Sequence, residues 1–141
     1  MASGKGVTRQ NAALDWLLGV GTPTRPETSN PIKIALCITT DPTESSAATG
    51  LTGTGYTAGG TAITFDTAAS GSTDGDTGSA ISWTNGSGGT WTITGAIIHD
   101  AAGAAHPAAA DMIYWDDLFD VSVPDAATLE IAIDGVTITE S

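Results

Sequence analysis

The chain has 141 residues, a length that fits one domain with a single hydrophobic core. Its formal net charge at pH 7 is −12, and its four basic residues all lie in the first 33 positions: Lys5, Arg9, Arg25 and Lys33. Of the 16 acidic residues only Asp15 and Glu27 lie there, so the rest of the chain repels phosphates and is unsuited to binding DNA or RNA.

The N-terminal residues predict a short helix. Residues 1–6 are not followed by an apolar run, so we expect no secretion signal, and no segment approaches the roughly 20 consecutive apolar residues of a membrane span. Residues 8–18 carry apolar side chains at helical spacing, with Thr8 as the expected N-cap and Gly19 as the expected end. A helix this short is unstable alone in water, so it must pack against its own domain or a partner.

After a Pro- and Thr-rich connector over residues 20–31, the chain changes to short β segments. We therefore expect an N-terminal arm, residues 1–31, and a β domain, residues 32–141. About eight strands are predicted: 32–39, 62–65, 80–84, 90–98, 112–115, 119–123, 128–133 and 136–139. Because no helices interleave, the fold class is mainly β, an antiparallel β-sandwich or jelly-roll-like domain with a short N-terminal α-helix.

Local signals within these strands predict further detail. Four residues of the first strand should share one face: Ile32, Ile34, Leu36 and Ile38. Gly95 indicates a bulge, and Asp134-Gly135 between two β runs predicts a hairpin. Cys37 is the single cysteine of the sequence, so no intrachain disulfide can form, which fits a reducing compartment.

Residues 43–61 and 66–79 are rich in Gly, Ser, Thr and Ala, and we expect surface loops or weakly paired edges there. We interpret Trp83 and Trp91 as core residues on paired strands, although exposed tryptophans could instead stack on sugars. Trp16 differs, because it lies on a helix that needs a partner, and it is a candidate for an interface.

The sequence contains no motif for catalysis, a cofactor or a metal. One cluster combines histidines and carboxylates: His99, Asp100, His106 and Asp111. These spacings match no metal motif, and we expect a strand end and a loop with surface histidines. Asp74-Gly75-Asp76 resembles the start of a calcium loop but lacks the later Glu, so a solvated turn is expected, as it is for Asp116-Asp117. Neither a nucleophile elbow nor a phosphate loop occurs.

The remaining candidates belong to a partner contact. They are the basic and apolar residues of the arm: Lys5, Arg9, Leu14, Trp16, Leu17, Leu18 and Arg25. The first 33 residues carry a net charge of about +2 and the rest about −14, so a basic arm could dock while an acidic body faces solvent. Alternatively, the acidic surface only aids solubility.

The order of segments also resembles a known family. Residues 17–19 read Leu-Leu-Gly, residues 34–42 form a strand ending in Thr-x-Asp-Pro, and residues 91–103 look like the family's run from a Trp to Asp-Ala. Together with Gly55-Tyr56, the strand 62–65 and the Thr-rich C-terminal strand, these segments are similar to small virion proteins of tailed phages, commonly labelled tail fibre or minor capsid proteins. The chain departs from the family after Tyr56, where the usual Gly-x-Tyr-x-Arg has no arginine.

The resemblance implies a non-enzymatic virion component that is made in the host bacterial cytoplasm. The leading expectation is a capsid decoration protein that binds the major capsid protein on the outer shell as a trimer, with no nucleic acid or membrane contact. The alternative is a tail fibre or tail-tip module that binds a host receptor or glycan through residues 43–61 and 66–79 and an exposed aromatic such as Tyr56. A glycan hydrolase, the third class, would need two carboxylates flanking a cleft.

Overall fold

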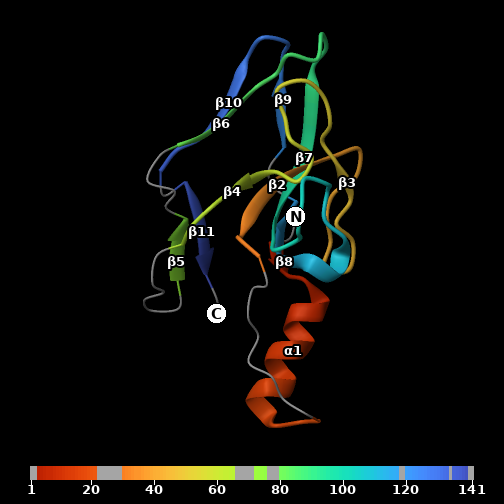
Figure 1. Ribbon diagram of the computed structural model, residues 1–141, viewed down its shortest axis with the longest axis vertical. Helices are drawn as coiled ribbons and strands as arrows, with labels where there is room; N and C mark the ends of the chain where they lie inside the picture. The colour runs from red at the N-terminus through yellow and green to blue at the C-terminus, as the bar shows by residue number, and fades with distance from the viewer. Residues whose placement is uncertain are drawn as a thin grey trace.

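The computed structural model describes residues 3–21, 30–65, 72–75, 80–117, 120–133 and 135–139 (Figure 1). These residues form antiparallel sheets with one short α-helix near the N-terminus, so the expected mainly β fold is confirmed. In chain order the elements are β1 (Ser3–Lys5), α1 (Val7–Leu18), β2 (Lys33–Ile38), β3 (Thr49–Gly50), β4 (Thr61–Ala62), β5 (Ser72–Gly75), β6 (Ile81–Thr84), β7 (Trp91–His99), the 3₁₀ helix η1 (Ala109–Asp111), β8 (Met112–Asp116), β9 (Val121–Val123), β10 (Thr128–Ile131) and β11 (Val136–Thr139).

The long strand β7 lies at the centre of the largest sheet. It pairs with β2 along one edge and with β8 and β9 along the other, in each case antiparallel. The outer edge of β2 pairs with β4 near its start and with β3 near its end. β1 pairs with β8, so part of the expected N-terminal arm is a strand of this sheet.

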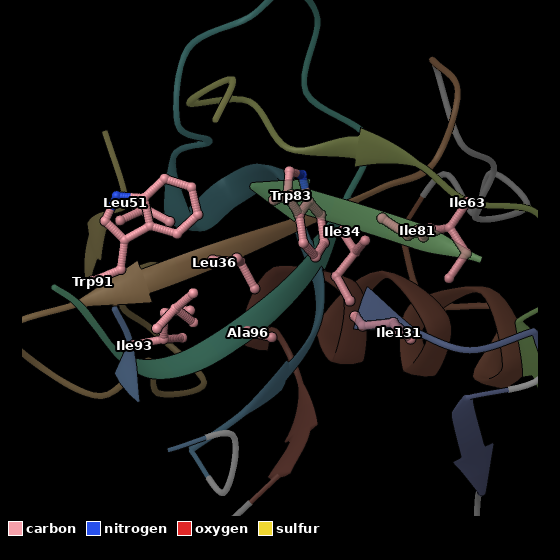
Figure 2. Packing of buried hydrophobic residues seen from close by; sticks show 11 residues of the cluster. Ile34, Leu36, Leu51, Ile63, Ile81, Trp83, Trp91, Ile93, Ala96 and Ile131 are labelled. Atoms are coloured by element: carbon pink, nitrogen blue, oxygen red, sulfur yellow. The ribbon is translucent and has the colours of Figure 1, made fainter. Parts of the chain in front are cut away.

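The remaining strands form two ribbons, β6 with β10 and β5 with β11, which lie beside the large sheet (Figure 1). Apolar side chains of the ribbons and of one face of the sheet enclose a common core, as in a sandwich (Figure 2). The buried members of this core are Ile34, Leu36, Leu51, Ile63, Ile81, Trp83, Trp91, Ile93, Ala96, Val123 and Ile131.

The alternation predicted for the first strand is confirmed. The main core includes or directly contacts Ile32, Ile34, Leu36 and Ile38. The intervening residues Ala35 and Cys37 belong to a second cluster on the opposite face, together with Ile97 and Met112. Burial raises the pKa of the Cys37 thiol to about 12, so this side chain acts as a small apolar residue.

The bulge predicted at Gly95 is also confirmed. Cys37 pairs with Gly95, whereas the next residue, Ile38, pairs with Ile93, so β7 carries one extra residue at this point. A Cβ on Gly95 would collide with the ring of Pro42. Glycine is therefore needed here for the close approach of the loop that follows β2.

Three predictions about turns and strand pairing are wrong. β10 pairs with β6 and β11 with β5, so the strands that flank Gly135 do not form the expected hairpin; Asp134 itself lies outside the described residues. Asp74 and Gly75 belong to β5 rather than to a solvated turn. Trp83 and Trp91 are core residues, as expected, but their strands do not pair. In each case a distant segment decides the pairing, which local sequence does not encode.

The helix begins one residue earlier than predicted, and its N-cap is Gly6 rather than Thr8. The N–H of Gly6 donates to the Ile113 carbonyl, and a Cβ on Gly6 would collide with the Met112 carbonyl, so the sheet determines where the helix begins. At the other end, Gly19 has φ 66° and its N–H donates to Asp15, which confirms the predicted left-handed end.

Candidate functional site: the exposed end of the N-terminal helix

α1 projects away from the β layers, and only its base contacts them (Figure 1). The contacts of this base are with β8 and η1, and no residue of α1 is buried. Because isolated helices of this length are marginal in water, a projecting helix depends on its attachment to the sheet and on whatever contacts its free end.

The attachment consists of backbone and side-chain bonds around the first turn. Gly6 is bonded to β8, and the N–H of Val7 donates to the Glu44 carbonyl at 2.8 Å. The Gln10 side chain donates to the Lys5 carbonyl at 2.9 Å, which links the helix to β1. The bond from Val7 gives a partner to one of the N–H groups that a helix N-terminus otherwise leaves without one.

An ion pair completes the attachment. The Arg9 guanidinium donates to the Asp100 carboxylate, 91 residues away at the end of β7. The Asp100 side chain is only 4% exposed, and its backbone carbonyl accepts a hydrogen bond from Asn30 at 2.9 Å. Arg9 was expected to contact a partner. Its guanidinium instead forms an ion pair within the chain, and this pair orients the helix.

The positive charge of the arm does not gather at the free end of the helix. Lys5 lies in β1 opposite Tyr114, and Arg9 is paired with Asp100, so both lie at the helix base. Arg25, the third cation expected in the contact, lies outside the described residues. From Gln10 to Gly21 the sequence holds a single ionised side chain, Asp15.

What gathers at the free end is apolar surface. We call it the apolar end of α1, and its members and exposed fractions are Leu14 53%, Trp16 48%, Leu17 72%, Leu18 69% and Val20 56%. The helical spacing of the sequence predicts all of these except Val20, which follows Gly19 in the connector. Side chains of this size seldom gather on a free surface without a binding role.

The apolar end has two sides. Because successive helical residues turn by about 100°, the three leucines lie within an arc of about 100°, which we call the leucine face. Trp16 lies on the roughly opposite side, in line with Arg9 two turns earlier, and so on the side by which the helix is tied to Asp100. The leucine face therefore points away from the attachment.

The histidine–carboxylate cluster lies where β7 ends and the following loop begins. The expectation of surface histidines is wrong for His99. This side chain is fully buried: Nδ1 accepts the Ala101 N–H at 3.1 Å, so Nε2 carries the hydrogen and donates to the Gly59 carbonyl at 3.1 Å. Burial lowers the pKa of His99; Lys33 and His106 lower it further, while the bond to Gly59 and Asp111 act in the opposite direction.

His106 is half-buried, and its Nε2 donates to the Ala47 carbonyl at 2.8 Å. It packs against Gly50, where a Cβ would collide with the imidazole ring. Among the residues that the structure describes, no group of three or more His, Cys, Asp or Glu side chains is placed to hold a metal ion. The contacts of the two histidines hold the loops around Gly59 and Ala47 in place.

Tyr56, expected as an exposed aromatic, is instead part of the core. Its ring packs between Trp83 and Trp91, with centroid separations of 5.9 and 6.2 Å, and its hydroxyl oxygen accepts the Leu36 N–H at 2.7 Å. Burial raises the pKa of Tyr56 to about 12. The loop that carries Tyr56 is thereby fastened to the centre of β2.

No protein-family model matches the chain, and no curated protein matches it either. None of the described helices has the length and hydropathy needed to cross a membrane.

Proposed function

We propose that the protein is a non-enzymatic structural component of a tailed-phage particle, a capsid decoration protein that binds the outer shell through α1. The observation that carries this proposal is the apolar end of α1, which stands clear of a compact acidic β body. In the proposed arrangement the helix contacts the major capsid protein and the acidic body faces solvent, where its charge keeps neighbouring particles apart.

The proposed protein is made in the bacterial cytoplasm and is carried on the virion, and its contact needs neither nucleic acid nor membrane. A shell offers many identical sites, so copies that are joined to one another bind several sites at once, and a contact that is weak for one copy still holds them. We propose a trimer, because closed symmetry would place three copies around one local axis of the shell.

The copy number per particle tests the proposal. Quantitative mass spectrometry of purified virions should find this chain at hundreds of copies, in proportion to the major capsid protein. A handful of copies would place it in the tail, and its absence from virions would refute a structural role.

The alternative, a tail fibre module that binds a receptor or glycan, loses its main support in the structure. Tyr56, the aromatic expected to stack on a sugar, lies between two tryptophans of the core. A glycan array with the full chain tests this alternative directly, since a decoration protein should bind no glycan on it.

A further inference from the structure

We infer that the apolar end of α1 enters a preformed apolar groove on a different protein, and that neither charge nor a second copy of this chain holds it. This inference rests on the proposed function, in which the different protein is the shell protein. It goes beyond that function by assigning the chemistry of the contact and the residues that make it.

The first argument is the distribution of charge. The two described cations of the arm lie at the helix base, and Arg9 is committed to Asp100. Between Gln10 and Gly21 the sequence offers one carboxylate, Asp15, against the five apolar residues of the apolar end. A highly charged surface on the partner would have to be desolvated against these side chains without compensation, whereas an apolar groove would not.

The second argument is that apolar side chains lie on more than one side of the helix. The leucine face covers one side of α1, and Trp16 covers part of the other. A helix that lies on a flat surface needs a single apolar stripe, while one that is apolar on several sides is enclosed by its surroundings. The occupied site is therefore a groove that contacts both the leucine face and Trp16 rather than a flat surface that contacts one of them.

The third argument concerns a second copy. A second copy packed side by side with α1 would cover one side of each helix and leave either the leucine face or Trp16 exposed, whereas a groove covers both. The trimer proposed above is therefore held by contacts other than α1.

The experiment compares binding of the full chain with that of three variants to phage shells prepared without it, measured by co-sedimentation. The triple variant L14Q/L17Q/L18Q removes the leucine face but keeps helix propensity, because glutamine is a good helix former. The matched control is I133S, which removes an equally exposed apolar side chain, 50% exposed, just after β10. Far-UV circular dichroism confirms that each variant is folded.

We expect the triple variant to bind at least tenfold more weakly, the I133S variant to bind as the wild type does, and W16Q to lose several-fold in affinity. Raising NaCl from about 50 to about 500 mM should change wild-type affinity by less than threefold, since an apolar contact releases few counterions. A tenfold fall with salt would overturn the inference in favour of an electrostatic contact, including one made by Arg25.

The remaining outcomes separate the inference from the function on which it rests. If the triple variant binds shells as tightly as the wild type does, the groove is refuted and the decoration function still stands. Failure of the wild type to bind shells would refute the decoration function itself. A wild-type oligomer in sedimentation equilibrium that becomes monomeric in the triple variant would identify a second copy as the occupant and overturn the inference.

Discussion

The ion pair between Arg9 and Asp100 can be tested by a double-mutant cycle. The first variant is R9M, which keeps the alkyl stem of the arginine and removes its charge. The second is D100N, which keeps the shape of the carboxylate, and the third combines both. The Asp100 side chain is 4% exposed and that of Arg9 is 22% exposed. R9M therefore leaves a buried carboxylate without the guanidinium, whereas D100N leaves a partly exposed guanidinium without the carboxylate.

R9M leaves a buried carboxylate without its counter-charge, and removal of one member of a buried pair costs about 3 to 5 kcal/mol. Because Arg9 is partly open to solvent, water can reach part of this site, and we expect the lower end, about 3 kcal/mol of unfolding free energy. D100N leaves a cation that can turn toward solvent, so we expect about 1.5 kcal/mol. The double variant should cost about 2 kcal/mol, which gives a coupling energy of about 2.5 kcal/mol.

Urea unfolding followed by tryptophan fluorescence measures these free energies. An unchanged slope of unfolding free energy against urea concentration shows that the variants expose the same amount of surface on unfolding. For a chain of this size, the R9M loss corresponds to a fall in melting temperature of about 10 °C. Purely additive losses, or an R9M loss below about 0.5 kcal/mol, would mean that the pair is a solvated surface contact and that α1 is oriented by its backbone bonds alone.

Further predictions concern the buried polar groups. Y56F should lower the unfolding free energy by about 1 to 2 kcal/mol, because the Leu36 N–H loses its acceptor inside the core; a change within error would refute that bond. For His99, the folded-state pKa lies below the ordinary value of 6.5, so its contribution to stability is fully present above that pH and is lost as pH falls through and below it. Unfolding at pH 7.5 and at pH 5 should therefore show a smaller pH dependence in H99Q than in the wild type, and equal dependence would contradict this assignment. The Cys37 thiol, with its pKa raised to about 12, should resist alkylation at pH 8 until urea unfolds the chain, and rapid labelling of the folded protein would contradict its burial.

Features set by neighbouring residues were predictable from the sequence. The alternation around Leu36 repeats every two residues, which is the period of a strand, and the core follows it. Gly19 has the left-handed backbone conformation that glycine adopts easily, and Gly95 interrupts the alternation of its strand, so the helix end and the bulge carried local signals.

The exposed end of the helix was predictable in part. Leu14, Leu17 and Leu18 recur at helical spacing in a segment too short to be stable alone, and this combination indicated a need for a partner. Val20 carried no such signal, since it follows the residue that ends the helix. The sequence also placed Arg9 with this surface, because nothing near it in the chain indicates a bond to Asp100.

Tertiary structure decided the features in which segments far apart in the chain meet. β10 and β11 are adjacent in sequence, yet each completes a different ribbon, because the core must be covered over its whole width. Tyr56 became a core residue because the Leu36 N–H and two tryptophans meet it from other elements. The sequence by itself thus determined a mainly β chain with a short apolar helix, whereas the fold determined that Arg9 anchors this helix and that its free end is apolar rather than basic. The physical reason is that periodicity and backbone preference are local, while pairing, burial and charge neutralisation depend on which distant residues the fold brings together.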